Sequence, residues 1–132
     1  MDREKLVSLT LRGFDRTAQD AAALIGVIPS CLGNRGEPVR PTVKTLLVRS
    51  YVQYSMRFPD EYVLSDMLPD FLTYLGGVKL ICDVQSQLQP EFSEFHFDLP
   101  VIESDESQEG YFSTADIADI AQLRASISLG FY

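Results

Sequence analysis

The chain has 132 residues, 45% of them hydrophobic and 23% charged, with a mean hydropathy of zero; these values are typical of one globular domain and exclude a fibrous or disordered chain. Nineteen acidic against eleven basic residues give a net charge of −8, which disfavours nucleic acid and anionic membranes as partners. Because we find neither a secretory leader nor an apolar run of about 18 residues, we expect a cytoplasmic protein whose Cys31 and Cys82 are free thiols.

The first 26 residues predict a strand followed by a short helix. Residues 5–12 alternate between apolar and polar side chains, which is the period of a half-buried strand, and Gly13 ends it. Residues 17–26 predict a helix, because Thr17 suits the N-cap and Gly26 suits the left-handed position that follows a helix.

The middle of the chain predicts a loop, a long strand and a second helix. Glycine, asparagine and proline concentrate in residues 30–42, which indicates an ordered loop. Residues 43–56 are rich in β-branched and aromatic side chains and predict a strand. Apolar residues recur at helical spacing over 61–75, where Pro69 must either kink the helix or lie near its start.

Two further strands are predicted after this helix. Residues 78–88 alternate Val, Leu, Cys and Val with polar or larger side chains, so Cys82 is expected in a strand. Residues 92–99 alternate in the same way, and the short proline-containing link between the two segments predicts a hairpin.

The last 30 residues predict an acidic loop, a helix and a strand. Residues 103–110 are acidic and lack periodicity, residues 113–124 begin with a pattern similar to a capping box, and residues 125–132 alternate again. The predicted order is β-α-β-α-β-β-α-β. We therefore expect a single α+β domain over residues 1–132, with a mostly antiparallel sheet of about five strands and three short helices.

Three stretches are similar to one bacterial family. They are residues 9–15 (LTLRGFD), residues 24–30 (LIGVIPS) with Gly36-Glu37, and the helix and strand that end at Tyr132. On these stretches, nearly the whole chain resembles the bacterial family known as domain of unknown function 4279. The family has no established activity. The resemblance implies a small α+β fold, and the association of family members with toxin immunity clusters implies a role in binding another protein.

Glu94, His96 and Asp98 are the residues most suggestive of a metal or catalytic site. They share one face of a predicted strand, where successive side chains lie about 6.6 to 6.8 Å apart. A metal ion needs every ligand atom within about 2.0 to 2.6 Å, so two of these residues would need a further ligand from a neighbouring strand. The alternative is a solvated polar face. His96 is the only histidine, and no motif places a serine beside it. We expect no metal, no cofactor and no catalytic residues.

Basic residues cluster in the first half of the chain, around the sequence Gly33-Asn34-Arg35-Gly36. Backbone donors and an arginine fork can hold an anion, although this spacing matches neither the P-loop nor the dinucleotide fingerprint. A turn with solvated charges is the alternative. The candidate anion-binding residues are Arg35, Arg40, Arg49 and Tyr51.

The acidic residues are segregated more strongly than the basic ones. Nine acids and no Lys or Arg lie between Glu91 and Asp119. Solubility and helix N-terminal charge are structural reasons for acids here. A negative surface can also steer and hold a basic protein. The candidate residues for such a contact are Glu103, Asp105, Glu106 and Glu109.

Three functions follow as hypotheses. The first is a non-enzymatic cytoplasmic binding protein, of the immunity type, that engages a basic protein through the acidic half. The second is a domain that binds or transforms a small anionic ligand in a pocket near Arg35, Arg40 and the mid-chain tyrosines. The third is a homodimeric module, which an exposed apolar sheet face would indicate.

Overall fold

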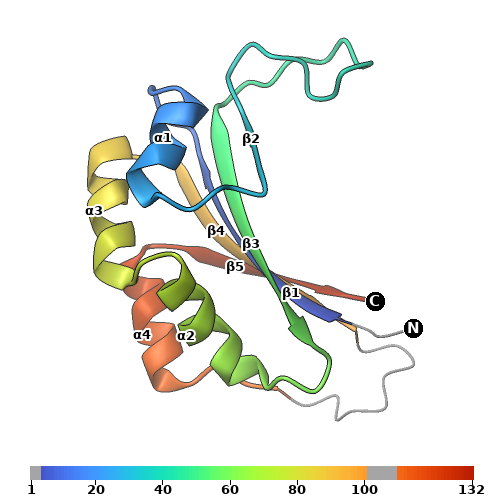
Figure 1. Ribbon diagram of the computed structural model, residues 1–132, viewed down its shortest axis with the longest axis vertical. Coiled ribbons are helices and arrows are strands. Elements are labelled where there is room, and N and C mark those ends of the chain that lie inside the picture. Colours follow the sequence, from blue (N-terminus) through green and yellow to red (C-terminus); the bar gives the residue numbers. More distant parts are fainter. Residues whose placement is uncertain (1–3, 101–109) are drawn as a thin grey trace.

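In the computed structural model, which describes residues 4–100 and 110–132, one five-stranded sheet runs through the molecule (Figure 1). The strand order is β2-β3-β1-β4-β5, so β1 is central. The strands are β1 (Glu4–Arg12), β2 (Cys31–Gly33), β3 (Tyr51–Pro59), β4 (Phe92–Leu99) and β5 (Ser126–Phe131).

Four helices cover one face of this sheet and leave the other face open (Figure 1). They are α1 (Ala18–Ile25), α2 (Leu64–Tyr74), α3 (Val78–Leu88) and α4 (Thr114–Gln122). Within the described residues, no helix combines the length and the apolar character that a membrane crossing requires. The α+β class and the five-stranded sheet are confirmed, while the expected three helices are corrected to four.

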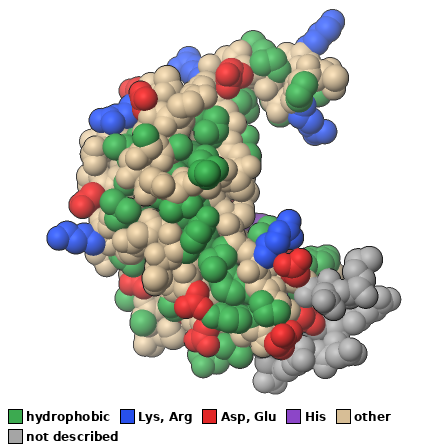
Figure 2. All heavy atoms as spheres, in the orientation of Figure 1, with side chains coloured by type: hydrophobic (Ala, Val, Ile, Leu, Met, Phe, Trp, Pro, Cys, Tyr) green, Lys and Arg blue, Asp and Glu red, His purple; other side chains and the backbone are tan. Residues whose placement is uncertain are grey.

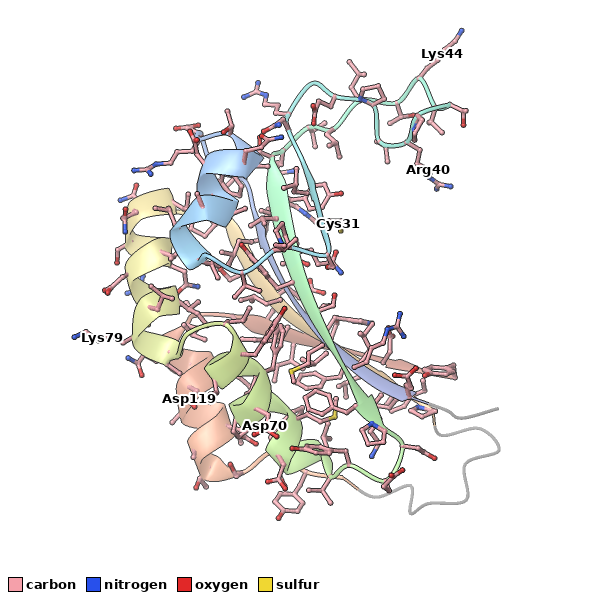
Figure 3. All side chains as sticks on the ribbon, in the orientation of Figure 1. Cys31, Arg40, Lys44, Asp70, Lys79 and Asp119 are labelled. Atoms are coloured by element: carbon pink, nitrogen blue, oxygen red, sulfur yellow. The ribbon has the colours of Figure 1, made fainter. Side chains whose placement is uncertain are left out.

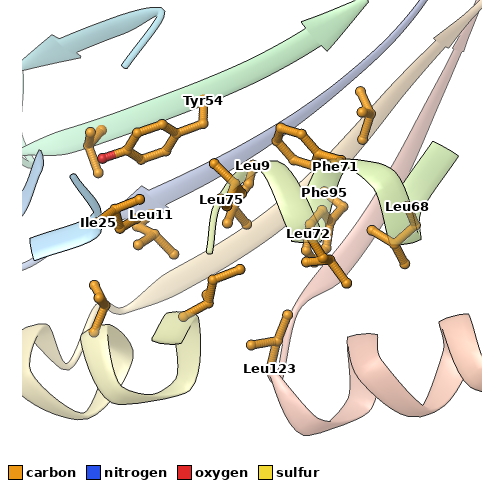
Figure 4. Close-up of a cluster of buried hydrophobic side chains, with 14 of the residues drawn as sticks. Leu9, Leu11, Ile25, Tyr54, Leu68, Phe71, Leu72, Leu75, Phe95 and Leu123 are labelled. Carbon is orange, nitrogen blue, oxygen red and sulfur yellow. The ribbon is translucent and has the colours of Figure 1, made fainter. Parts of the chain in front are cut away.

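The core lies between the sheet and the helices, as Figure 4 shows. On β1, the buried face carries Val7, Leu9 and Leu11, as the alternation predicts. Leu9 lies opposite Tyr54 of β3 and Phe95 of β4, so one row of side chains continues across three strands. Each large apolar side chain buried here contributes about 1.5–3 kcal/mol relative to an exposed position.

The caps predicted for the first and last helices are confirmed. Thr17 Oγ1 accepts a hydrogen bond from the backbone N–H of Asp20 at 3.1 Å, and Gly26 adopts the left-handed conformation after α1, with φ 85°. Before α4, Ser113 and Asp116 form a reciprocal capping box. These bonds satisfy backbone donors that a helix start otherwise leaves unpaired.

The prediction of a strand over residues 78–88 is wrong, because this segment is α3. Its buried side chains are Ile81, Val84 and Leu88, three and four residues apart, which is the helical period. Gly76 and Gly77, both with positive φ, reverse the chain between α2 and α3. In place of the first strand of the predicted hairpin the chain forms α3, which packs against α1.

The prediction of a strand over residues 43–56 is also wrong in its bounds. β3 begins at Tyr51 and continues to Pro59. The loop expected over 30–42 contains the short β2, and Pro69 lies within α2 on its exposed side.

Within the described residues the sheet is mostly antiparallel, as expected, because three of its four strand pairs are antiparallel. It is nevertheless mixed, because β4 and β5 pair in parallel. A parallel pair needs a crossover connection, and α4 supplies it.

Residues 34–50 form an arm that projects from the sheet between β2 and β3 (Figure 1). The arm is held by its own backbone hydrogen bonds, including Gly36 N–H to Leu47 O at 2.9 Å and Val39 N–H to Thr45 O at 2.8 Å. Every residue from 35 to 46 is exposed. The core therefore gains nothing from the tip of the arm.

The hydroxyl of Tyr54 gives a test of this packing. The side chain is fully buried, its hydroxyl has no hydrogen-bond partner among the described residues, and burial raises its pKa to about 12. Because an unpaired buried hydroxyl is costly, we expect Tyr54→Phe to raise the free energy of unfolding by up to about 1 kcal/mol at pH 7.

The effect of Tyr54→Phe on stability should also depend on pH in the alkaline range. Between pH 10, the ordinary pKa of tyrosine, and pH 12, the unfolded chain loses the Tyr54 proton while the folded chain keeps it, so stability falls by roughly 1.4 kcal/mol per pH unit from this group. Urea unfolding at pH 7 and pH 11 should show the advantage of Tyr54→Phe widening at the higher pH. An equal advantage at both values would contradict the assignment.

Candidate functional site

The open face of the sheet is polar and lies in a hollow of the molecular surface. Figure 2 shows this hollow between the arm and the lower body of the protein. Side chains that alternate with the core residues point to this face. They include Ser8, Thr10, Gln53, Ser55, Glu94, His96 and Ser128.

A chain of hydrogen bonds runs through the only histidine on this face. We call it the His96 network, and its members are Glu94, His96, Asp98 and Ser128. Ser128 donates from Oγ to Glu94 Oε1 at 2.8 Å. His96 lies 2.5 Å from Ser128 Oγ through Nδ1 and 2.8 Å from Asp98 Oδ1 through Nε2.

The direction of these hydrogen bonds bears on catalysis. A hydroxyl has one proton, and that of Ser128 is donated to Glu94. Both ring nitrogens of His96 are engaged, Nδ1 with Ser128 Oγ and Nε2 with Asp98 Oδ1. Activation of a serine requires that its proton be directed to a ring nitrogen. The Ser128 proton is instead directed to Glu94, and the imidazole lies between the Ser128 hydroxyl and the Asp98 carboxylate.

The network agrees in part with the sequence analysis. The prediction that Glu94, His96 and Asp98 share a polar face is confirmed. Ser128 was not predicted to join them, because its contact requires the parallel pairing of β4 and β5. Within the described residues, no three His, Cys, Asp or Glu side chains are placed to hold a metal ion.

A second feature lies at the end of the open face where β1 stops and β4 begins. It is a pocket of about 440 Å³, which we call the arginine pocket. Its lining includes three arginines from distant parts of the chain. The lining residues are Arg12, Arg49, Glu91, Phe92, Ser93, Glu94, Arg124 and Ser126.

Gly13 joins the segments that form this pocket. Its N–H donates to Ser50 O at 2.9 Å, and its carbonyl accepts from Glu91 N–H at 3.1 Å. Gly13 has a φ of 85°, and a Cβ there would lie 2.8 Å from Cβ of Glu91. Only glycine meets both demands without strain. Gly13, which ends the predicted first strand, thus positions Arg12 beside Arg49.

The anion-binding residues proposed from the sequence lie in two places. Arg35 and Arg40 are on the exposed arm, and Figure 3 shows Arg40 directed away from the body. Arg49 lies at the base of the arm and lines the arginine pocket. Tyr51 begins β3, close to Arg12 and Cys31, where burial and then Cys31 raise its pKa.

Two arginines of the pocket were missed by sequence reasoning. Arg12 was placed only as a polar residue of the first strand, and Arg124 only as the end of the last helix. Arg124 has a positive φ of 51° in the turn between α4 and β5. Their shared signal is position at the end of an element, since Arg12 ends β1 and Arg124 lies in the turn after α4.

The acidic candidates Glu103, Asp105, Glu106 and Glu109 lie outside the described residues. The chain enters described structure again at Gly110, where a Cβ would lie 3.0 Å from Leu64 at the start of α2. Acidic side chains are also found on the two helices of this region, as Figure 3 shows for Asp70 on α2 and Asp119 on α4.

Comparisons with protein-family models, curated proteins and solved structures gave no match to this chain.

The His96 network can be tested through Gly130, which lies beneath it. A Cβ at position 130 would lie 2.7 Å from Asp98 Oδ1 and 3.3 Å from His96 Nε2. We expect Gly130→Ala to displace the carboxylate and change the NMR signals of the His96 ring nitrogens. The loss of stability should stay below about 1 kcal/mol, because the pair is partly solvated.

A matched control is Gly36→Ala, because a Cβ at Gly36 meets nothing within 4 Å. It should leave the His96 signals unchanged. Identical ring signals in Gly130→Ala and the unmodified protein would show that the network does not depend on this contact.

Proposed function

We propose that the chain is a non-enzymatic protein-binding module, of the immunity type, that uses an acidic surface of its C-terminal half to engage a basic partner. The proposal includes a cytoplasmic location. The immunity role rests on the sequence resemblance, whereas binding itself is supported by the charges and exposed side chains described below.

The observation that carries the proposal is an acidic surface without basic neighbours along the chain. Residues 58–78, which include α2, and residues 110–123, which include α4, contain no Lys or Arg. The two helices are neighbours. The acidic surface comprises Glu61, Asp66, Asp70 and Asp119. In space one basic group borders it, since Lys5 donates from Nζ to Tyr62 O at 2.6 Å. The acids outnumber this lysine, and an excess of one sign accelerates association with an oppositely charged protein.

Exposed apolar and aromatic side chains accompany these acids. Val63 precedes α2, Tyr111 leads into α4, and Ile117 lies on α4. Their exposed fractions are 55%, 68% and 56%. Such side chains supply contact area that charge alone does not, and tyrosine is enriched among residues that dominate binding energy. Acidic, apolar and aromatic side chains exposed together favour binding of a protein over simple attraction of small cations from solution.

The opposite sign of charge is found on the arm. Arg35, Arg40 and Lys44 outnumber its Glu37 over residues 35–46, all of which are exposed. Figure 2 shows basic side chains on the arm and acidic ones toward the other end of the molecule. A basic partner is therefore oriented toward α2 and α4 and away from the arm.

Self-association remains a prediction, with β5 as the surface that favours it. β5 is an edge strand and carries no charged residue. Ile127, Leu129 and Phe131 lie on its helix-facing side and are exposed. The open face itself is polar in the described residues, so the sheet face does not provide the apolar patch that a homodimer would bury.

The binding proposal is tested by charge reversal. The protein is immobilised and exposed to a lysate of its native host at about 50 mM salt, and bound proteins are identified by mass spectrometry. We expect a basic protein that high salt releases. Glu61→Lys with Asp119→Lys, which reverses two charges of the acidic surface, should abolish its capture.

The matched control is Asp15→Lys with Asp83→Lys, which makes the same change in net charge on exposed positions elsewhere. It should retain the partner. If no basic protein is captured, or if both double variants lose it equally, the acidic surface is not the binding site.

A further inference from the structure

We propose that the arginine pocket binds the oxyanion group, a phosphate or a carboxylate, of a small organic molecule. This site is distinct from the acidic surface, and of the residues that the sequence suggested for an anion it contains only Arg49.

The three guanidinium groups of the pocket are not equivalent. Arg49 is paired, because its Nε lies 3.0 Å from Glu91 Oε2 and its guanidinium lies 5.1 Å from the centre of the Phe92 ring. Arg12 and Arg124 have no side-chain hydrogen bond or ion pair with a described residue. Two guanidiniums with unused donors therefore border one pocket, and such groups bind carboxylate and phosphate in a bidentate manner.

The two carboxylates that line the pocket do not remove this capacity. Glu91 is engaged by Arg49, and Glu94 accepts from Ser128. The pocket holds three basic and two acidic side chains, so its net charge is positive in a chain whose total is −8. The unused donors and the excess positive charge both select an anion over a cation.

Strand pairing and backbone hydrogen bonds position several residues of the pocket. Arg12 is the last residue of β1 and lies opposite Phe92 of β4 in register. Gly13 links this end of β1 to Ser50 and Glu91 through backbone hydrogen bonds. Arg124 follows α4, where its N–H donates to Ala121 O. The backbone of Arg12 is therefore fixed by strand pairing, which lowers the entropy that it loses on binding, while Arg49 and Arg124 come from the arm and from a turn.

The size and lining of the pocket indicate the kind of molecule. A volume of about 440 Å³ falls in the range of small-molecule sites, which is about 300 to 1,000 Å³. Phe92 is about half exposed at the wall. We therefore expect a ligand with an apolar or planar portion beside its anionic group.

The test uses three probes. Phenyl phosphate and benzoate share a ring and differ in the anion, and inorganic phosphate lacks the ring. Titration calorimetry on the full chain should show saturable binding of at least one probe with a Kd of about 1 mM or tighter. Tighter binding of phenyl phosphate assigns a phosphate ligand, and tighter binding of benzoate assigns a carboxylate.

The decisive variant is Arg12→Gln with Arg124→Gln, which should weaken binding at least about tenfold, since a hydrogen bond to a charged group contributes about 1.5–3 kcal/mol. Arg35→Gln with Arg40→Gln removes the same charge from the arm and should change the Kd less than about twofold. If the first pair fails to fold, Arg124→Gln alone is used.

Absence of saturable binding for all three probes, or an equal loss in both double variants, overturns the proposal. The capture of a basic protein by the acidic surface is measured without these probes, so failure at one site leaves the result at the other site unaffected.

Discussion

The pairing of β1 on both of its edges is the constraint on which the rest of the structure depends. All nine residues of β1 have a partner on β3, and seven have one on β4. A shift of one residue in either register would move Val7, Leu9 and Leu11 from the core to the open face. The buried alternation therefore fixes both registers, and with them the position of every side chain on the open face.

The polar features follow from this register. Ser8 on β1 lies opposite Ser55 of β3 on one side and His96 of β4 on the other. The parallel pairing of β5 then adds Ser128 beside His96. At the end of the strand, Arg12 is carried to Phe92 in the same way. The His96 network therefore needs no dedicated loop, because core packing aligns its residues. The arginine pocket also needs Arg49 from the arm and Arg124 from the turn after α4.

Sequence patterns predicted the elements that local chemistry determines. Residues 5–12 and 92–99 contain one dominant period, and the two capped helices carry their own start signals. Residues 78–88 satisfy two periods at once, since Val78 and Val84 fit an alternation as well as a helix. The segment forms a helix because the core side of the sheet would otherwise be left uncovered. As α3, it covers that side with Ile81 and Leu88. That information is tertiary and is not contained in a local window.

The candidate sites likewise contain some contacts that a local sequence pattern predicts and others that depend on the tertiary fold. The shared face of Glu94, His96 and Asp98 could be predicted, because alternation within one strand determines it. The contact with Ser128 and the approach of Arg124 to Arg12 could not, because they depend on strand order and on a crossover through α4. Residues 43–50 have strand composition but find no partner in the sheet, and they form one side of the arm instead. β-branched composition is therefore a condition for a strand and not a sufficient cause.

The two proposed binding surfaces can coexist in a chain with a charge of −8 because the acids that follow β3 lie at the other end of β1 from the arginine pocket. The acidic surface begins near the end of β3, which pairs with Glu4, whereas the arginine pocket lies at Arg12. These two residues are roughly 26 Å apart along the strand, given a rise of about 3.3 Å per residue. At physiological ionic strength charges are screened over about 8 Å. Glu61, near the end of β3, therefore does not cancel the local field of the arginines, although Asp119 lies only five residues before Arg124. Net charge alone is a poor guide to what each end of this molecule binds.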